Sequence, residues 1–325
     1  MEYKLLGRTG VTVSQLCFGT MSFGDTADEK MSEAMYKRCR EIGINFFDCA
    51  DVYAGGRSEE ILGKLMANER DELVITSKVA SPVDGGSINK RGYSRRHVMR
   101  QVEKSLKRLN TDRIDIYFLH HYDPTVPIEE AVRALDDLVT QGKILYPAVS
   151  NWSAWQTAQA LKIAEYEGLA RIEVLQPMYN LVKRQAEVEI FPLAQYEDIA
   201  VIPYSPLGGG LLTGKYGKNK KPDSGRIVDS QMYTKRYSEE SYYETAENFT
   251  AYAQEKGYHP ATLAVAWAMA HPSVTAPIIG ARNLDQLKDS LAALNVDMTP
   301  EWRAEMSALS YTPPLANDRL EEQIG

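Results

Sequence analysis

Eight short apolar runs, rich in β-branched and aromatic residues, alternate with amphipathic stretches along this 325-residue chain. The runs cover residues 16–19, 44–48, 73–78, 114–120, 144–150, 173–176, 200–205 and 276–280, and the clearest helical patterns cover 95–109, 128–141, 154–167 and 187–198. Strands that alternate with helices of this size pair in parallel through right-handed crossovers. Eight such units follow one another, and no domain-sized segment differs from the rest in amino-acid composition. We therefore predict an α/β fold, a closed (β/α)8 TIM barrel, with residues 1–325 forming a single domain.

Three stretches depart from this alternation. Residues 3–15 predict a small N-terminal β-hairpin ahead of the barrel, and residues 311–325 form a C-terminal extension. The interval between the seventh and eighth runs is much longer than the others, with a polar stretch over 215–241 and helical patterns over about 240–256 and 260–271. Pro147 lies inside the fifth run, where a proline removes a ladder hydrogen bond, so we expect that strand to be short or irregular there.

Composition and charge disfavour several classes of protein. The chain has 37 basic and 44 acidic residues, a net charge of −7, and no lysine or arginine block, so we expect no nucleic-acid partner. Cys17, Cys39 and Cys49 form no CxxC pair, which is typical of reduced thiols in a cytosolic protein. No apolar run approaches the ~18 residues of a membrane span. We therefore predict a cytoplasmic, soluble protein without membrane insertion, while its oligomeric state has no readable signal.

Polar residues follow the apolar runs at their C-terminal ends. They are Thr20, Asp48, Lys78, His120, Ser150 with Asn151, Gln176, Tyr204 with Ser205, and Gly280 with Arg282. In a (β/α)8 barrel the active site forms at that face from the strand ends. Because the second, third and fourth strands are neighbours, we expect the carboxylate of Asp48, the ammonium of Lys78 and the imidazole of His120 to lie side by side.

Tyr53 follows Asp48 by five residues, which is close enough for the chain to fold back over the same face. A free tyrosine has a pKa of about 10, and a neighbouring ammonium lowers it. A carboxylate would hold that ammonium in place, and an imidazole would orient a carbonyl group and stabilise negative charge on its oxygen. These four side chains therefore predict proton transfer to a carbonyl oxygen.

Eight stretches carrying these residues resemble the aldo-keto reductase family, and the resemblance covers nearly the whole chain. They are GTMSFG (19–24), GINFFDCADVYAGGRSEEILG (43–63), VITSKV (74–79), SLKRLNTDRIDIYFLHHYDP (105–124), VSNWS (149–153), LQPMYNL (175–181), YSPLGGGLLTGKY (204–216) and IIGARNLDQLKDS (278–290). The middle segment is most similar to the branch that contains aryl-alcohol dehydrogenase-like reductases and potassium-channel β subunits.

The resemblance implies an NADPH-dependent reductase acting on a small-molecule carbonyl substrate. It makes Tyr53 the proton donor, with Asp48, Lys78 and His120, rather than His121, completing a tetrad. The cofactor contacts that it implies are Thr20, Met21 and Asp48; Ser150, Asn151 and Gln176 at the nicotinamide carboxamide; Tyr204 stacked on the nicotinamide ring; Ser205, Pro206, Leu207, Gly208, Gly209, Lys215 and Arg226 at the phosphates; and Gly280, Arg282, Gln286, Asp289 and Ser290 at the adenosine end. Arg282 is the expected partner of the 2′-phosphate.

Some residues depart from the family pattern. Cys49 replaces a threonine, which we expect to be tolerated sterically, and Leu145, Pro147 and Ala148 replace the usual residues of the fifth strand. Ser290 replaces an asparagine that contacts adenine, so we expect adenosine contacts to be weakened or rerouted.

Other functions remain to be weighed against this one. The segment 209–215 imitates a phosphate-binding P-loop, but Tyr216 occupies the position that needs serine or threonine for Mg²⁺. No G-x-G-x-x-G follows an N-terminal strand, which disfavours a Rossmann dehydrogenase. We expect no metal at His120 and His121, because adjacent residues on an extended segment point to opposite faces. Two rivals stay open: a cofactor-bound regulatory or sensor subunit, and a Schiff-base lyase that uses Lys78. The sequence does not indicate the physiological substrate.

Overall fold

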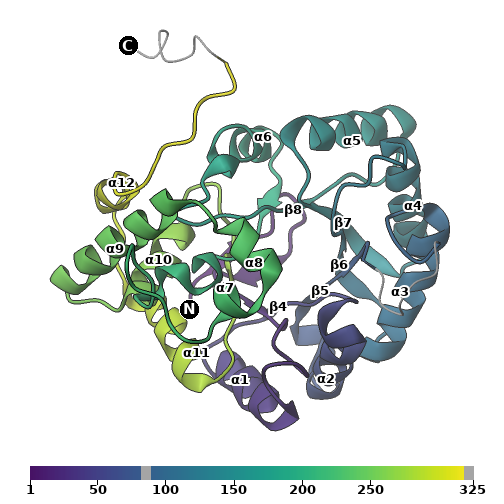
Figure 1. Cartoon of the computed structure of the whole chain (residues 1–325). Coiled ribbons are helices and arrows are strands. Elements are labelled where there is room, and N and C mark those ends of the chain that lie inside the picture. The colour runs from purple at the N-terminus through teal and green to yellow at the C-terminus, as the bar shows by residue number, and fades with distance from the viewer. Residues whose placement is uncertain (82–88, 318–325) are drawn as a thin grey trace.

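The computed structural model describes residues 1–81 and 89–317 and shows a parallel β-barrel inside a ring of helices (Figure 1). The strands are β3 (Cys17–Gly19), β4 (Phe46–Asp48), β5 (Val74–Val79), β6 (Ile114–Leu119), β7 (Ile144–Ser150), β8 (Val174–Gln176), β9 (Ala200–Val201) and β10 (Ile278–Ile279). All neighbouring strands pair in parallel, in the order β10-β3-β4-β5-β6-β7-β8-β9. The backbone N–H of Ile278 donates to the carbonyl oxygen of Pro203 at 2.9 Å, which joins the two ends of the sheet. The predicted (β/α)8 barrel is confirmed.

The helices lie outside this barrel. They are α1 (Glu29–Glu41), α2 (Arg57–Leu65), α3 (Arg95–Leu109), α4 (Ile128–Thr140), α5 (Ala154–Glu167), α6 (Ile190–Tyr196), α7 (Arg226–Asp229), α8 (Gln231–Arg236), α9 (Glu240–Glu255), α10 (Pro260–Met269), α11 (Leu284–Leu291) and α12 (Pro300–Ser307). Local sequence sets their ends: α5 begins at a capping box between Ser153 and Gln156 and ends at Gly168, whose φ is 67°. No helix in the described ranges is long and apolar enough to cross a membrane.

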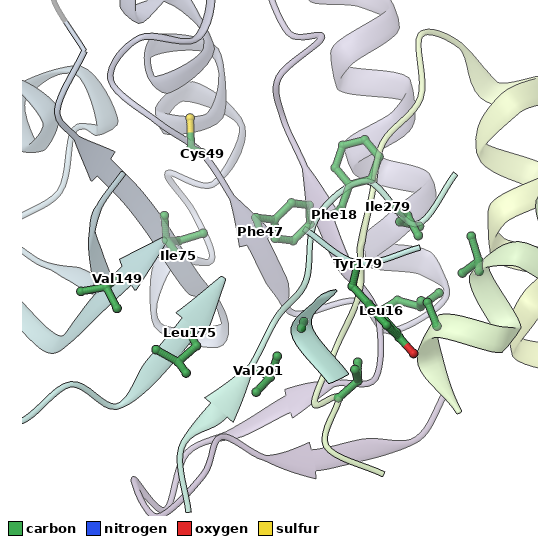
Figure 2. Close-up of a cluster of buried hydrophobic side chains, with 14 of the residues drawn as sticks. Leu16, Phe18, Phe47, Cys49, Ile75, Val149, Leu175, Tyr179, Val201 and Ile279 are labelled. Atoms are coloured by element: carbon green, nitrogen blue, oxygen red, sulfur yellow. The ribbon is translucent and has the colours of Figure 1, made fainter. Parts of the chain in front are cut away.

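Alternation along the strands divides the core into two layers. Phe46 and Val74 point into the barrel, where they pack with Phe118 and Val174. The next residue of each strand points outward and packs against the helices, and Figure 2 shows several of these side chains, including Phe47. This two-residue period also decides which side chains at the strand ends point toward the barrel axis.

The predicted N-terminal hairpin is confirmed. Strands β1 (Tyr3–Leu5) and β2 (Thr12–Ser14) pair antiparallel, with Lys4 opposite Val13. Leu6 and Val13 are fully buried in the inner layer of the core. The hairpin therefore packs against the inside of the barrel, and the site is left at the opposite, C-terminal ends of the strands.

The expectation of a short or irregular fifth strand at Pro147 is wrong. Strand β7 runs from Ile144 to Ser150 without a break, and Pro147 pairs in register with Tyr117 of β6. The carbonyl oxygen of Pro147 accepts a hydrogen bond from the N–H of Glu173 at 2.9 Å. The N–H position and the carbonyl of one residue point to the same side of a strand. The N–H that Pro147 lacks would therefore face the residues just before β8 begins, where no hydrogen bond of the sheet is required.

Two further stretches lie between β9 and β10 and after α12. Helices α9 and α10 match the two helical patterns predicted in the long interval, and α7 and α8 add short helical turns inside its polar stretch. The chain after α12 runs outward from the barrel as far as it is described (Figure 1). Residues 82–88, which follow β5 in the sequence, and residues 318–325 of the predicted extension lie outside the described residues.

Candidate active site

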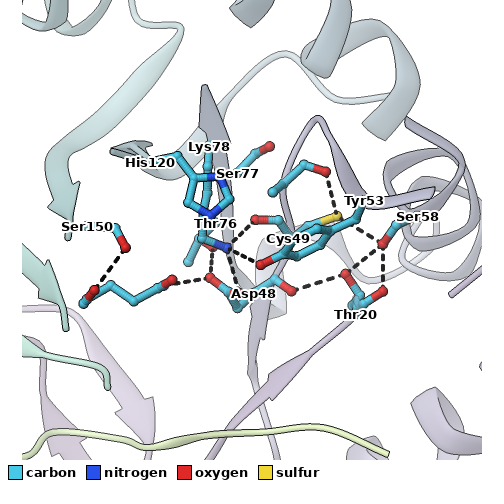
Figure 3. A network of polar contacts seen from close by, with 12 residues as sticks. Thr20, Asp48, Cys49, Tyr53, Ser58, Thr76, Ser77, Lys78, His120 and Ser150 are labelled. Atoms are coloured by element: carbon cyan, nitrogen blue, oxygen red, sulfur yellow. Dashed lines mark hydrogen bonds and ion pairs between the residues drawn. The ribbon is translucent and has the colours of Figure 1, made fainter. Parts of the chain in front are cut away.

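Lys78 joins Asp48 and Tyr53 in one polar network at the strand ends, and the ring of His120 lies beside it (Figure 3). Lys78 Nζ donates to Asp48 Oδ2 at 2.7 Å, to the carbonyl oxygen of Cys49 at 2.7 Å and to Tyr53 Oη at 3.2 Å. The ring of His120 lies edge-on to the ring of Tyr53, with centroids 6.2 Å apart. The structure thus brings together the four residues that the sequence placed in a tetrad, and all three ammonium protons of Lys78 have acceptors.

The strands position these groups through their alternation. Asp48 follows the inward-facing Phe46 by two residues, and His120 follows the inward-facing Phe118 by two. Lys78 lies two residues beyond Thr76, which pairs in register with Asp48. Tyr53 arrives differently, at the start of the turn η1 (Tyr53–Gly56), whose next residue, Ala54, has a φ of 50°. This positive φ bends the chain back so that the phenol faces the strand ends.

Asp48 is held by hydrogen bonds from three directions. Its Oδ1 accepts from Thr76 Oγ1 at 2.7 Å and from Gln176 Nε2 at 2.9 Å, while Oδ2 accepts from Lys78. Only 2% of Asp48 is exposed. A carboxylate held by this many donors fixes the Lys78 ammonium in one orientation.

The protonation states of Lys78 and Tyr53 suit Tyr53 as a proton donor. Burial by itself lowers the pKa of Lys78, but the Asp48 carboxylate and the Tyr53 hydroxyl outweigh it and raise that pKa, so the amine stays charged. Burial raises the pKa of Tyr53 above its ordinary value, although Lys78 opposes this shift. The net direction differs from the lowering expected from the sequence, because desolvation of the phenolate is the larger effect. Tyr53 therefore carries its proton at neutral pH.

His120 is neutral in this environment. Burial and then the Lys78 charge lower its pKa well below the ordinary value. Its Nδ1 is buried and has no hydrogen-bond partner among the described residues. A neutral imidazole can donate one hydrogen bond to a carbonyl oxygen without carrying charge into the site.

His121 corrects one expectation. Its ring stacks on the ring of His120, with centroids 4.6 Å apart and an interplanar angle of 7°, so the two side chains do not point to opposite faces. The strand β6 ends at Leu119, and the extended geometry that the prediction assumed ends with it. Within residues 1–81 and 89–317, no group of three or more His, Cys, Asp and Glu residues could hold a metal ion.

A cavity of about 770 Å³ opens above the tetrad. Most of the residues predicted at the site line it: Met21, Asp48, Tyr53, His120, Ser150, Asn151, Gln176, Tyr204, Ser205, Pro206, Leu207, Gly209, Lys215, Arg226, Gly280, Arg282, Gln286 and Asp289. Thr20, Lys78, Gly208 and Ser290 lie outside this lining. Lys78 is fully buried beneath Asp48 and Tyr53, and Thr20 Oγ1 donates to the carbonyl oxygen of Asp48 at 3.1 Å. The Oγ of Ser290 is buried without a partner in the described part of the chain.

A chain of hydrogen bonds links the strand ends beside His120. Tyr204 Oη donates to Asn151 Oδ1 at 2.7 Å, and Asn151 Nδ2 donates to the carbonyl oxygen of His120 at 2.9 Å. Ser150 Oγ donates to the carbonyl oxygen of Gln176 at 2.9 Å. Asn151 has a φ of 58° and Ser205 a φ of 59°, positive values that are uncommon outside glycine. Such backbone strain clusters at functional sites, where it aims polar groups at a ligand.

A glycine-rich turn continues the wall of the cavity. Gly208, Gly209 and Gly210 have φ values of 59°, 68° and 104° in the turn η4 (Gly208–Thr213). A Cβ atom on Gly209 would lie 2.9 Å from the ring of Tyr233 on α8. The backbone of these glycines carries no side chains, and the ammonium of Lys215 follows it in the chain. Backbone N–H groups and an ammonium suit an extended ligand that carries phosphates.

A second buried carboxyl group, that of Asp51, lies two residues before Tyr53 in the chain. Asp51 is fully buried, and Gln101 and the backbone of Val52 lie near enough to its carboxyl group to oppose a rise of its pKa. Burial, with a smaller contribution from the nearby Glu59, raises the pKa of Asp51 to about 8. Glu59 accepts from Arg108 Nε at 2.6 Å and is fully buried. Asp51 is therefore protonated at neutral pH.

Helix α8 and the loop after β5 supply lining residues that were not predicted. They include Ser81, Met232, Tyr233 and Arg236. The signal that could have indicated α8 is the length of the polar interval between the seventh and eighth strands, in which charged residues concentrate.

The sequence model of the Aldo/keto reductase family matches residues 15–310. The chain belongs to the aldo/keto reductase family. The relatives of this chain carry names of two kinds. It is 36% identical over 323 residues, 97% of this chain and 98% of the relative, to a "Probable voltage-gated potassium channel subunit beta" of Oryza sativa subsp. japonica.

Two other relatives are named as enzymes. "Uncharacterized oxidoreductase YrpG" of Bacillus subtilis (strain 168) is 36% identical over 311 residues, 93% of each chain. "Versiconal hemiacetal acetate reductase" of Aspergillus parasiticus is 30% identical over 326 residues, 93% of this chain and 94% of the relative. Together with the family, these names support an oxidoreductase and match the branch indicated by the sequence.

Proposed function

We propose that this aldo/keto reductase reduces an aldehyde or ketone to an alcohol, with NADPH as hydride donor and Tyr53 as proton donor. The observation that carries the proposal is the hydrogen bonding of one buried ammonium, Lys78, to both Asp48 and Tyr53. When bound, NADPH would supply a hydride from nicotinamide C4 for the carbonyl carbon. The chain's own residues then have to hold the carbonyl oxygen and deliver one proton to it.

Tyr53 is suited to deliver that proton. Its hydroxyl is protonated at neutral pH, and as charge grows on the substrate oxygen the proton moves from Tyr53 Oη to that oxygen. The phenolate left behind lies 3.2 Å from the Lys78 ammonium, which stabilises it. The neutral His120 donates a hydrogen bond to the same oxygen and orients the carbonyl.

The residues of the cavity fit a dinucleotide that carries an additional phosphate. The close approach at Gly209 leaves room for backbone but for no side chain, and Lys215, Arg226 and Arg282 line the cavity beyond it. In our proposal Gln176 and Asn151 bind the nicotinamide carboxamide, Tyr204 stacks on its ring, and Arg282 binds the 2′-phosphate. Asn283 caps α11 next to Arg282 by accepting from the N–H of Gln286 at 3.0 Å. The cap keeps the adenosine end of this surface in place.

The Schiff-base lyase is disfavoured by the same geometry. An amine must be neutral and accessible to attack a carbonyl carbon. Lys78 is fully buried, its pKa is raised, and its three protons are donated to three acceptors. Lys78 is better suited to stabilise the phenolate of Tyr53.

A cofactor-bound sensor subunit remains a second candidate, because the rice relative is named as a channel β subunit. The two candidates differ in turnover. A reductase turns over a carbonyl panel with NADPH, whereas a sensor binds NADPH with negligible turnover and associates stably with a membrane partner in a pull-down.

Tyr53→Phe tests the proposed function. We expect turnover to fall by about 10²–10⁴-fold, because the general acid is lost while packing is kept. NADPH affinity, measured by quenching of tryptophan fluorescence, stays at the wild-type value. Tyr122→Phe is the matched control, because Tyr122 packs nearby but does not line the cavity. Wild-type turnover in Tyr53→Phe would contradict the assignment of the acid.

A further inference from the structure

Four cationic side chains line the cavity, and the proposed cofactor uses three of them. Lys215, Arg226 and Arg282 are assigned to phosphates, which leaves Arg236 at the end of α8. None of the four forms an ion pair with a carboxylate inside residues 1–81 and 89–317. Asp25 also lines the cavity, but it forms no ion pair with Arg236. Arg236 is therefore a cation without an assigned function.

Arg236 lines the same cavity as His121 and Tyr204. Its charge lowers the pKa of His121 in addition to the larger effect of burial, and it opposes the rise that burial causes in the pKa of Tyr204. The ring of His121 stacks on His120, and Tyr204 is hydrogen-bonded to Asn151 beside it. The charge of Arg282 acts instead on Tyr216, which lies near the expected adenosine end.

The Arg236 guanidinium packs near the ring of Tyr233 and has no carboxylate partner among the described residues. Its central carbon lies 4.9 Å from the centroid of the Tyr233 ring, and the central carbon of Arg226 lies 5.4 Å from the same centroid. Arg236 is only partly exposed, so it has lost part of its hydration. A guanidinium stays charged at any physiological pH, and its planar fork fits a carboxylate or phosphate through two parallel hydrogen bonds. Two cations near one ring also repel each other, and an anion bound beside them would relieve that repulsion.

We propose that Arg236 binds an anionic group, a carboxylate or a phosphate monoester, on the carbonyl substrate. Tyr53 and His120 hold the carbonyl oxygen while Arg236 holds the other end of the molecule. The inference rests on the proposed reduction and deepens it, because it names the substrate class: aldehydes and ketones that carry a negative charge.

The proposal is tested by comparing kcat/KM for pairs of carbonyl substrates that differ in charge. One pair is 4-carboxybenzaldehyde and 4-nitrobenzaldehyde, which have similar shape and differ in charge. The other is glyceraldehyde 3-phosphate and glyceraldehyde, which separates a phosphate from a carboxylate preference. We expect the wild type to prefer at least one anionic member, and Arg236→Met to lose about ten- to one-hundred-fold of that preference through KM. Arg236→Lys keeps part of it because it keeps the charge.

Arg226→Met is the matched control. It removes a cation over the same tyrosine ring, so it changes local charge and packing in the same way. We expect it to weaken NADPH binding and to leave the ratio of kcat/KM between the anionic and the neutral substrate as in the wild type. Arg236→Met should leave NADPH affinity unchanged.

A binding measurement separates this inference from the proposed reaction. Benzoate and benzamide are titrated by calorimetry into the protein saturated with NADP⁺, and neither reacts. Tighter binding of benzoate than of benzamide, lost in Arg236→Met and kept in Arg226→Met, supports the anion site even if no aldehyde is reduced; the reductase proposal then fails alone. Equal binding of the two molecules by the wild type, or an unchanged benzoate preference in Arg236→Met, overturns the anion site, whatever the turnover.

Discussion

On the strand side of the cavity, the charged groups of Asp48 and Lys78 are buried and paired at 2.7 Å, and every ammonium proton has an acceptor. On the α7–α8 side, Arg226 and Arg236 are partly exposed and lie against a tyrosine ring without a carboxylate partner among the described residues. The difference indicates two tasks. The strand side is organised before any ligand arrives and is suited to chemistry, whereas the helical side holds charge that a ligand can complete.

The largest expected effect comes from breaking the paired side. Lys78→Met leaves Asp48 buried without its cation, and we expect the free energy of unfolding to fall by about 3–5 kcal/mol. Lys215→Met is the matched control on the other side, because Lys215 is exposed; its effect stays within about 0.5 kcal/mol. Urea unfolding measures both. Similar losses in the two variants would remove the contrast between the sides.

An intermediate effect comes from the adenosine end. Arg282→Gln removes the proposed partner of the 2′-phosphate, so NADPH affinity should fall by about ten- to one-hundred-fold while NADH affinity stays unchanged. Lys288→Gln, on the exposed face of α11 and outside the cavity lining, should change neither. Tryptophan quenching by each nucleotide measures the affinities. Equal weakening of both nucleotides would assign Arg282 to a group that they share.

An effect that depends on pH comes from the buried carboxyl group of Asp51. Because the pKa of Asp51 is raised to about 8, the folded chain keeps a proton that the unfolded chain releases above about pH 4. Stability is therefore lost as pH rises from about 4 to about 8. Asp51→Asn removes this loss, so the variant should unfold at higher urea concentration than the wild type at pH 8, with the gain shrinking toward pH 4.

Asp297→Asn provides the control for this measurement, because Asp297 is exposed. It should show no pH-dependent difference from the wild type. A stability gain for Asp51→Asn that is as large at pH 4 as at pH 8 would mean that the proton of Asp51 is not its source.

The tetrad could be predicted because the pattern that makes the strands also aims their ends. Asp48 and His120 occupy inward positions two residues after Phe46 and Phe118, so alternation alone places them at the barrel axis. The expected irregularity at Pro147 is absent because β8 begins beyond the point that the missing N–H would face. The sequence does not show where that neighbouring strand begins. The His121 expectation failed because the strand ended one residue earlier than assumed.

The sequence by itself determined the parallel barrel, its N-terminal hairpin and the meeting of Asp48, Lys78 and His120, because these follow from the order of strands and a two-residue period, whereas the turn η1 places Tyr53. Only the tertiary structure decided the balance of desolvation against charge at Tyr53, the burial of Asp51, and the presence of Arg236 in the same cavity as the two histidines. Those properties depend on contacts between segments far apart in the chain, and no local pattern encodes how deeply a group is buried or which charge faces it.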